Sequence, residues 1–558
     1  MIFRLAITPS LIVLMICSLL SAQEPLALTL RYQTPVFESV DNPDQTVQHA
    51  FHRLTRQDNW SPTRTAVIVC DMWDSHHCVN AVRRVHELVP RMDSFLNTMR
   101  AQGAKIIHAP SSCMAAYENT PARIRAQTVP ATEQYPTDIN SWCDQIPSEE
   151  LAAYPIDQSQ GGEDDDPLEH QLWASQLASM GRNPRSPWVR QAEGLTIDHE
   201  LDFISDNGSE IWNILTQYQL DNVMLVGVHT NMCVLGRPFG LRRLREAGKN
   251  VVLVRDLTDT MYDPQAWPYV DHFTGTDLVV AHIERFVCPT IASNQVLGGT
   301  EFRFSNDRRI RLAIIMAEDE YRTEQSLPIF AAKHLGRGFS VTYFYGSESD
   351  RSSIPGMEQI DDANALLVSV RRRPLPKSDL DLIRNFVAKG KPVLGIRTAS
   401  HAFALRNQEP AAGLDVWPLF DSQVFGGNYT NHYGNNLKST LSLPGSAHHP
   451  LLDAARHLDQ ISPGGSLYKT SPLAAGNRVL LLGTVEGQPA EPVAWTFVRA
   501  DGGRSFYTSL GHVDDFAKPE FENFLANAIR WSCGQELCSL ESTITQNQMH
   551  ASGKGKQR

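Results

Sequence analysis

The chain has 558 residues, a formal net charge of -12 at pH 7, 42% hydrophobic residues and 20% charged residues. This length exceeds what one hydrophobic core usually holds, so the sequence predicts two large domains. The acidic balance, with no basic cluster longer than Arg371–Arg373, disfavours nucleic acid and anionic membrane surfaces as partners.

The N-terminus is typical of a secretory signal peptide. Arg4 precedes an apolar run from Leu11 to Leu20, and Ser21-Ala22 offers a cleavage site. The alternative is a membrane anchor, but the run is shorter than the roughly 20 residues that span a bilayer. The sequence therefore predicts removal of residues 1–22 and a secreted or periplasmic protein that makes no membrane contact after cleavage.

Removal of the signal leaves cysteines whose pairing the sequence cannot fix. They are Cys70, Cys78, Cys113, Cys143, Cys233, Cys288, Cys533 and Cys538. In an oxidising compartment some of them could form disulfides, and the last two are the nearest candidates. Because no CxxC pair occurs, we do not expect a structural zinc knuckle.

The first half of the chain predicts an α/β domain over residues 62–295, after an irregular lead-in from residue 24. Thr65–Asp71 has the pattern of a buried strand that ends in an acid, a helix follows with apolar positions from Val82 to Met99, and Lys105–His108 is a second strand. A strand, helix and strand with this spacing indicate a parallel sheet.

Residues 114–191 interrupt this pattern. They are polar and rich in proline, and they include an acidic run at residues 161–167. Loops of this length inside a compact domain are usually functional or disordered. We therefore expect an insertion that lies over the carboxyl end of the sheet.

The regular pattern resumes around Cys233. Residues 222–228 predict a buried strand, Cys233 lies in the turn that follows, and apolar residues from Leu235 to Leu244 have helical spacing up to Gly248. Further elements in this part are a helix at residues 210–218, a strand at residues 250–256 and a helix at residues 278–286.

A second α/β series spans residues 308–535. Its predicted strands are residues 312–316, 339–344, 365–369, 392–396, 478–483, 493–497 and 504–508, and its predicted helices include residues 377–389 and 518–531. The tail at residues 539–558 is polar, and we expect it to be disordered. The fold class predicted for the whole chain is thus two doubly wound, mostly parallel α/β domains in tandem.

Asp71 and Cys233 each follow a predicted strand, at the edge where a doubly wound sheet binds its ligands. A carboxylate beside a thiol suits a hydrolase in which the acid takes the thiol proton and later activates water. Two other interpretations remain open: Cys233 could be a small buried hydrophobe, and Asp71 could cap a helix.

Asp71 on its apolar strand, with the run Gly227-Val-His-Thr-Asn-Met-Cys233-Val, resembles the isochorismatase-like cysteine hydrolase family over residues 62–292. The resemblance implies an Asp, Lys and Cys triad on a parallel sheet, with Asp71 as the base and Cys233 as the nucleophile. It also implies a cis peptide bond between Val228 and His229, and an oxyanion hole formed by the amides around Cys233.

The family's lysine is missing, because no lysine occurs between Lys105 and Lys249. Asp198, His199, Glu200 and Asp202 stand near the matching position. A protonated His199 could supply the positive charge, whereas an acid there would raise the pKa of the thiol.

A metal site is a weaker prediction. Nicotinamidases of this family hold zinc, and Asp71, His76 and His77 are the candidate ligands here. Adjacent histidines on a loop usually point in different directions, so we expect that the chain requires no cofactor, although a divalent metal stays open.

The second half resembles the ThuA-like family, named for trehalose utilisation, which shares the fold of class I glutamine amidotransferases. The motifs that carry this resemblance are residues 392–401, 449–450, 465–469 and 503–516. Glutaminase chemistry is not implied, since Arg397 or Thr398 stands where that chemistry needs a cysteine. Ser400, His401, His512 and Asp514 are candidates for binding a sugar-like ligand. The alternative is that Ser400 caps the helix after its strand and Asp514 caps the last helix.

These observations predict an exported cysteine hydrolase that cleaves an amide or related bond of a small molecule, joined to a ThuA-like accessory domain. The alternative is a binding or scaffold protein with incomplete sites, linked to carbohydrate breakdown. We expect a small-molecule substrate and a homo-oligomeric protein.

Overall fold

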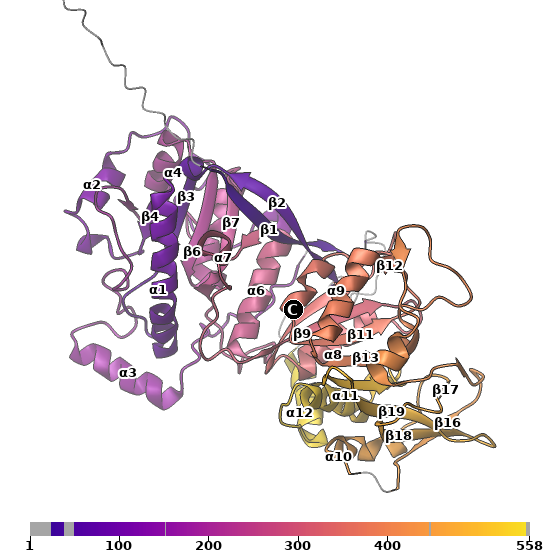
Figure 1. The fold of residues 1–558 in the computed structure, drawn as a ribbon. Coiled ribbons are helices and arrows are strands. Elements are labelled where there is room, and N and C mark those ends of the chain that lie inside the picture. The colour runs from indigo at the N-terminus through magenta and orange to yellow at the C-terminus, as the bar shows by residue number, and fades with distance from the viewer. Residues whose placement is uncertain (1–23, 38–49, 151, 446–447, 554–558) are drawn as a thin grey trace, which may run out of the picture.

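A computed structural model describes residues 24–37, 50–150, 152–445 and 448–553. These residues form two α/β halves, each built on a mostly parallel sheet of eight strands with helices packed against both faces (Figure 1). The predicted fold class is therefore confirmed. The predicted signal peptide, residues 1–22, lies outside the described residues.

The first sheet has the strand order β2-β1-β8-β7-β6-β3-β4-β5. Its strands are β1 Leu26–Pro35, β2 Phe51–Trp60, β3 Thr65–Cys70, β4 Lys105–Ala109, β5 Phe203–Ile204, β6 Asn222–Val228, β7 Asn250–Asp259 and β8 Thr290–Ile291. Strands β3 to β8 run parallel, and the chain builds outward from β3 before it returns to β6. This reversal makes the carboxyl ends of β3 and β6 the expected place for a ligand crevice.

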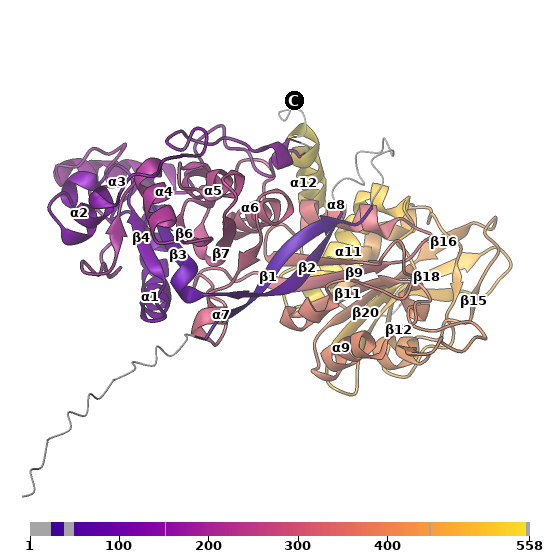
Figure 2. The same ribbon diagram turned by 90° about the horizontal axis from the view of Figure 1, so that it is seen from above.

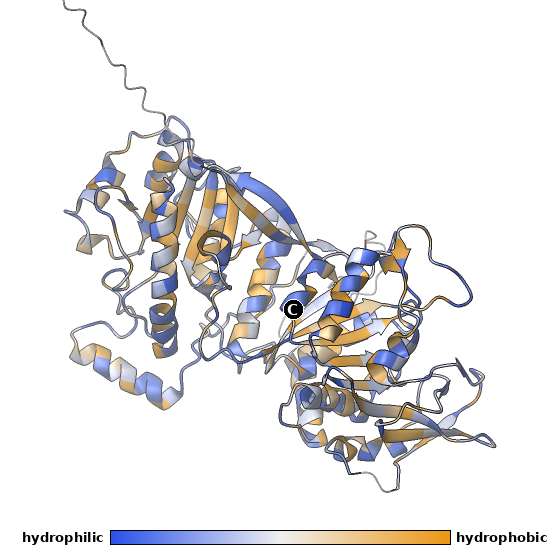
Figure 3. Ribbon diagram, viewed as in Figure 1, coloured by the Kyte–Doolittle hydropathy of each residue, from blue (hydrophilic) through white to orange (hydrophobic). Residues whose placement is uncertain are grey.

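Helices cover both faces of this sheet. They are α1 Val79–Ala101, α4 Gly208–Gln217, α5 Leu241–Glu246, α6 His272–Phe286 and α7 Asn294–Leu297. Helix α1 packs its apolar side on one face, and α4, α5 and α6 pack on the other. The strands between them are strongly hydrophobic (Figure 3), as a parallel sheet buried on both sides requires.

The expectation of an irregular lead-in is wrong for the described residues, because Leu26–Pro35 and Phe51–Trp60 pair as the antiparallel hairpin of β1 and β2. Alternating leucines explain it: Leu26, Leu28 and Leu30 are buried, and the residues between them face outward. Figure 2 shows this ribbon running from the first half to the second. Val36 and Ala50, near its far end, lie in the hydrophobic core of the second half, so the hairpin joins the two halves.

Residues 114–191 are more regular than we expected from their composition. They contain helices α2 Pro121–Thr128 and α3 Pro167–Ser179. Thr120 and Asp166 cap these helices by accepting hydrogen bonds from their first backbone N–H groups. Proline stands at the first position of each helix, where its missing N–H costs nothing.

The second sheet has the order β10-β9-β11-β13-β20-β19-β18-β16, with the first five strands parallel and the last three antiparallel. Its strands are β9 Ile310–Ala317, β10 Phe339–Tyr345, β11 Ala365–Val370, β13 Val393–Ile396, β16 Ser439–Ser442, β18 Arg478–Val485, β19 Glu491–Val498 and β20 Arg504–Thr508. Short strands outside it are β12 Leu375–Pro376, β14 Leu414–Asp415, β15 Asn431–His432 and β17 Tyr468–Lys469.

The helices of this half are α8 Thr323–His334, α9 Lys377–Ala388, α10 Leu451–Ala455, α11 Pro519–Ser532 and α12 Leu540–Gly553. For residues 540–553 the expectation of a disordered tail at 539–558 is wrong, because they form α12, whereas residues 554–558 lie outside the described residues. The polar side chains of α12 find partners in the body of the protein: Asn547 donates to buried Glu522 at 2.8 Å, and Gln546 bonds His334 at 3.1 Å. These contacts stabilise a helix that has little apolar surface to bury.

None of the eight cysteines in the described residues forms a disulfide, so the pairing considered for Cys533 and Cys538 does not occur. Cys533 ends α11, and the backbone N–H of Cys538 instead donates to Asn527 at 2.7 Å. No helix among the described residues is long and apolar enough to cross a membrane.

Candidate functional site

Asp71 and Cys233 meet at the carboxyl ends of β3 and β6, which are neighbouring parallel strands. Asp71 directly follows β3 and is fully buried, and Cys233 lies in the turn after β6 and is 8% exposed. Their side chains are within hydrogen-bonding reach of each other. The structure thus brings together the acid and the thiol that the sequence singled out.

The turn that carries Cys233 is tightly built. The Val228–His229 peptide bond is cis, the geometry that the family resemblance implied. Gly227, at φ 111°, approaches β3 so closely that a Cβ there would lie 2.0 Å from the carbonyl oxygen of Cys70. The Asn231 side chain exchanges two hydrogen bonds of 2.9 Å with the backbone of Met261, which fixes the turn beyond β7.

Arg237 supplies the positive charge of this site. Its Nε and Nη2 both lie 2.9 Å from Oδ2 of Asp71. Its charge also acts on the thiol, where it lowers the pKa of Cys233. Arg237 directly precedes Pro238, and the helical turn after Cys233 ends just before Arg237. The reason is that proline disfavours helical geometry at the residue before it.

His199 does not take the place of the lysine. Its carbonyl oxygen accepts from Arg125 at 2.8 Å, and its buried Nδ1 has no hydrogen-bond partner. The reason is its position in a loop before β5, which Arg125 holds through backbone oxygens. The position of the family's lysine pointed to His199 rather than to Arg237, although Pro238 was a visible signal of a break.

Burial governs the electrostatics of the pair. Burial raises the pKa of Asp71, against the opposing effects of Arg237 and of the Ser111 amide, which donates to Oδ1 at 2.7 Å. Burial also raises the pKa of Cys233, and the nearby Asp71 adds to the rise, whereas Arg237 and the backbone N–H of His229 oppose it. The resting site therefore holds a neutral thiol beside a base whose proton affinity is increased.

Aromatic rings from three segments form one wall beside the turn. Trp73 stacks on Trp188 of the insertion at 4.3 Å, and His76 lies 5.9 Å from Trp188 and 4.9 Å from His229. Burial lowers the pKa of His229 to about 4 and that of His76 well below its usual value. Both rings are thus neutral at physiological pH, and the wall is aromatic and uncharged.

The insertion also packs directly on the helix that follows Cys233. The ring of Trp142 lies 5.6 Å from the Arg237 guanidinium carbon. A Cβ on Gly236 would come within 2.4 Å of the same ring, so this close packing requires glycine. The insertion therefore packs against Arg237 as well as against the backbone at Gly236.

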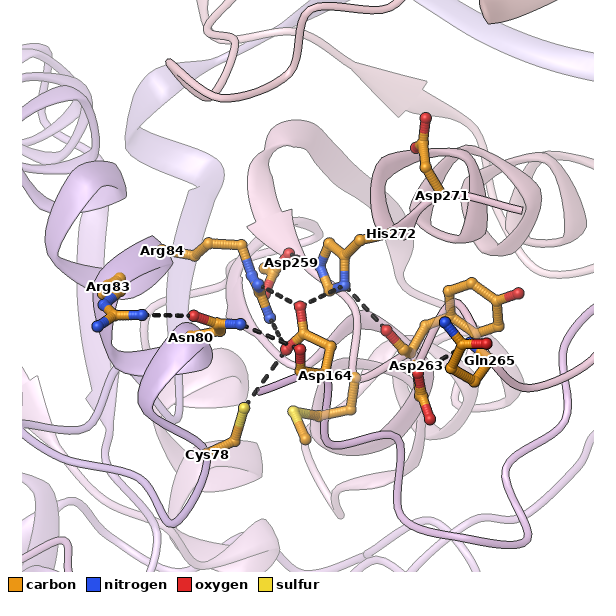
Figure 4. A network of polar contacts seen from close by, with 12 residues as sticks. Cys78, Asn80, Arg83, Arg84, Asp164, Asp259, Asp263, Gln265, Asp271 and His272 are labelled. Atoms are coloured by element: carbon orange, nitrogen blue, oxygen red, sulfur yellow. Dashed lines mark hydrogen bonds and ion pairs between the residues drawn. The ribbon is translucent and has the colours of Figure 1, made fainter. Parts of the chain in front are cut away.

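A buried polar network holds the insertion in place (Figure 4). Arg84 of α1 donates to both carboxylate oxygens of Asp164, at 2.8 and 3.0 Å, and to Asp259 at 2.7 Å. His272 lies 2.9 Å from Asp259 and 3.3 Å from Asp164, and the Cys78 thiol donates to Asp164 at 3.4 Å. Burial acts to raise the pKa of Asp259, but Arg84 and His272 hold it well below its usual value.

Two other acids of the acidic run at residues 161–167 connect the insertion to α1 and to the loop before it. Asp165 accepts from the backbone N–H of Val79 at 2.9 Å, at the positive N-terminus of α1, and Glu163 pairs with His77 at 3.0 Å. Since α1 begins at the carboxyl end of the sheet, the insertion lies over that end, as the sequence predicted.

The candidate metal ligands do not gather at one point. Asp71 is occupied by Ser111 and Arg237, and His77 pairs with Glu163. His76 accepts at Nδ1 from the backbone N–H of Cys78 at 3.2 Å. Within the described ranges, no group of three or more His, Cys, Asp or Glu residues is arranged to hold a metal ion.

The second half has its own polar cluster at the carboxyl end of its sheet. The Ser400 hydroxyl lies 3.1 Å from Nδ1 of His401, and Nδ1 of His512 lies 3.4 Å from Asp514. Arg397 connects the pairs, because it neighbours Ser400 in the turn after β13 and contacts the tyrosine on which His512 packs. None of the four predicted residues caps a helix through its side chain.

A comparison with models of protein families identifies one part of the chain. Residues 313–532 match the family model described as ThuA, trehalose utilisation, so the second half is ThuA-like. No curated protein matches the chain.

Three solved structures resemble one part of the chain each. A ThuA-like protein from Bacteroides uniformis is 18% identical with a TM-score of 0.31, over 42% of this chain and 95% of its own. A cysteine hydrolase from Pseudomonas syringae pv. phaseolicola is 17% identical with a TM-score of 0.26, and the match covers 43% of this chain and 93% of its own. A ThuA-like protein from Parabacteroides merdae is 14% identical with a TM-score of 0.27, and the match covers 41% of this chain and 92% of its own.

Proposed function

We propose that the first half is a cysteine hydrolase of the isochorismatase-like type, which cleaves an amide or related bond of a small molecule in an exported protein. The observation that carries the proposal is the contact of Arg237 with Asp71 beside Cys233, at the crevice of a doubly wound sheet. A base, a nucleophile and a fixed cation are the groups that this reaction needs. The ThuA-like half is an accessory domain in this proposal.

In the proposed reaction Asp71 removes the proton of the Cys233 thiol as the sulfur attacks the carbonyl carbon. The π electrons of the carbonyl move to its oxygen, where a backbone N–H of the Cys233 turn stabilises the negative charge. Val234 and Met232 already donate to the His229 carbonyl, which leaves the amide of Cys233 itself as the best placed donor.

The tetrahedral intermediate then collapses to a thioester. The protonated Asp71 gives its proton to the leaving nitrogen, and an amine or ammonia departs. Asp71 next takes a proton from water, whose oxygen attacks the thioester, and the thiol is restored as the acid product leaves. Arg237 offsets the negative charge that moves between the Asp71 carboxylate and the sulfur. No metal or other cofactor enters this scheme.

The test measures both the reactivity of the Cys233 thiol and the formation of an acyl group on it. Purified protein is incubated with a panel of small amides, ammonia release is measured, and hydroxylamine is added to trap an acyl group as its hydroxamate. Iodoacetamide alkylation of Cys233 is followed by peptide mass spectrometry from pH 6 to 10, with Cys288 as an internal reference. Cys288 is equally buried, but no carboxylate hydrogen-bonds its thiol in the described structure.

We expect Cys233 to react faster than Cys288 with iodoacetamide, and Asp71→Asn to slow ammonia release by about 100-fold or more, the usual contribution of a general base. Cys233→Ala should release no ammonia. Equal alkylation rates of the two thiols, or amide hydrolysis that survives Cys233→Ala, would reject the proposal.

One observation favours the alternative of a binding protein with an incomplete site. Cys233 is only 8% exposed, and the insertion is fixed over the crevice by the buried contacts of Arg84. In this alternative Cys233 is an inert core residue. It predicts that Cys233→Ala changes neither ligand binding nor any turnover, so the same experiments distinguish the two functions.

A further inference from the structure

Six residues of the second half form a contiguous cationic and aromatic cluster, which we name the Arg397 cluster. They come from the carboxyl ends of β9, β11 and β13 and from the segments that cover them. The members are Tyr321, Arg372, Arg397, His401, Tyr429 and Tyr468.

Arg397 is the buried centre of this cluster. It is 3% exposed, and its guanidinium carbon lies 4.4 Å from the ring of Tyr321 and 4.8 Å from the ring of Tyr468. Nη1 donates to the carbonyl of Ser509 at 2.7 Å and Nη2 to that of Ser466 at 3.4 Å, but the buried Nε has no hydrogen-bond partner. In the described part of the chain no carboxylate lies within ion-pair distance of Arg397.

The nearest acid that influences Arg397 is engaged elsewhere. Asp515 accepts hydrogen bonds from the backbone N–H groups of Gly464, Gly511 and His512, at 2.9 to 3.0 Å. Its charge reaches Arg397 only from a distance. A buried guanidinium without a paired anion is costly, which indicates that an anion from outside completes it.

A second cation follows β11, the strand that pairs with β13. Arg372, at φ 48°, is half-buried and donates only to the Ala404 carbonyl, at 3.2 Å. Its two neighbours in sequence are compensated, since Arg371 pairs with Glu320 at 2.5 Å and Arg373 contacts Asp319 at 3.4 Å. Of these three consecutive arginines, Arg372 is the one that no carboxylate neutralises in the described structure.

The positive charges of these arginines affect the pKa of His401. Burial lowers the pKa of His401 to about 2, together with the positive charges of Arg372, Arg371, Arg406 and Arg397. The imidazole is therefore neutral, and it stacks on Tyr429 at 4.5 Å. A positive potential thus surrounds an uncharged aromatic surface.

Tyr429 presents this surface to solvent. It is half-buried, lies 4.7 Å from Tyr468, and its backbone N–H donates to buried Asp421 at 2.8 Å. Aromatic faces pack well against the C–H face of a sugar ring, while guanidinium groups bind carboxylate and phosphate oxygens. The two features stand side by side here.

We propose that the Arg397 cluster binds an anionic sugar, whose carboxylate or phosphate oxygens accept from Arg372 and Arg397 and whose ring packs on Tyr429. This site is separate from Cys233, so it stands or falls independently of the hydrolase function.

The test uses isothermal titration calorimetry on the full-length protein with glucuronate, glucose 6-phosphate, glucose and inorganic phosphate. We expect at least one of the two anionic sugars to bind about tenfold or more tightly than glucose, a difference typical of a charge-assisted contact. The comparison of glucuronate with glucose 6-phosphate shows which anion fits. Equal binding of glucose and both anionic sugars, or inorganic phosphate binding as tightly as the sugar phosphate, would overturn the proposal.

Arg372→Gln should weaken binding by about tenfold or more, whereas Arg371→Gln, the neighbouring arginine with its own carboxylate, should change it less than about threefold. Tyr429→Ala provides a second test that leaves the arginines in place, and it should also weaken the sugar without affecting inorganic phosphate. Unchanged affinity in either Arg372→Gln or Tyr429→Ala would contradict the assigned site.

Discussion

The two halves place polar groups at the same edge of similar sheets, but they treat charge differently. In the first half three buried carboxylates at this edge meet a cation: Arg237 pairs with Asp71, and Arg84 pairs with both Asp164 and Asp259. In the second half Arg397 has no such partner in the described structure.

Under the two proposals, this difference corresponds to two uses of one architecture. A site that performs chemistry needs its charges fixed before the substrate arrives, because they must be ready when charge develops. A site that binds an anion can leave its cations uncompensated until the ligand completes them. The following predictions test this contrast, beginning with the largest expected effect.

Arg84→Met should destabilise the first half by about 3 to 5 kcal/mol, since it leaves Asp164 and Asp259 buried without their cation. The measurement is urea unfolding, followed separately for the two halves. Arg83→Gln is the matched control, because Arg83 and its partner Glu169 are exposed and should contribute less than about 1 kcal/mol. Equal effects of the two substitutions would show that the network does not hold the insertion.

Arg237→Gln should slow the alkylation of Cys233 by about 100-fold at neutral pH, a change of about 2.7 kcal/mol, because the cation that lowers the pKa of the thiol is lost. Arg237→Lys should recover part of the rate. Arg243→Gln controls for a general loss of positive charge, since Arg243 contacts only backbone carbonyls of the insertion. If Arg237→Gln leaves the rate unchanged, Arg237 is not the functional counterpart of the missing lysine.

Gly356→Ala should weaken the connection between the halves, with a cost of about 2 kcal/mol. Gly356 has φ 84°, and a Cβ there would lie 2.2 Å from the carbonyl oxygen of Arg53 in the hairpin. Gly476→Ala is the control, with φ 92° but no atom within 4 Å. The difference between the two in urea unfolding isolates the hairpin contact, and its absence would contradict the role of the hairpin as a connector.

Asp421→Asn should stabilise the second half relative to the natural protein by about 1 kcal/mol at pH 8, and by less at pH 5. Burial raises the pKa of Asp421 to about 7, against the opposing hydrogen bond from Tyr429. The native state therefore retains a proton that the unfolded state has lost, and stability falls as pH rises toward 7. Thermal unfolding at both pH values measures this, with exposed Asp453→Asn as control. A pH-independent difference would contradict the raised pKa.

Much of the fold could be predicted from local patterns. The strands that lead to Asp71 and Cys233 are continuous apolar runs, and their buried character follows directly from composition. The hairpin of β1 and β2 also had a local signal, which is the alternation of Leu26, Leu28 and Leu30 with more exposed residues. Helix α12 had no comparable signal, because polar contacts such as that of Asn547 with Glu522 stabilise it.

The candidate site could also be predicted in part from local patterns. Strand ends are local features, so the sequence by itself determined that Asp71 and Cys233 belong at the carboxyl edge of a parallel sheet. Which cation reaches Asp71, and which arginine of the second half stays without a carboxylate, are decided by contacts between distant segments. Only the tertiary structure chooses Arg237 over His199 and separates Arg372 from Arg371, because ion pairing depends on separations of a few ångströms that no local pattern encodes.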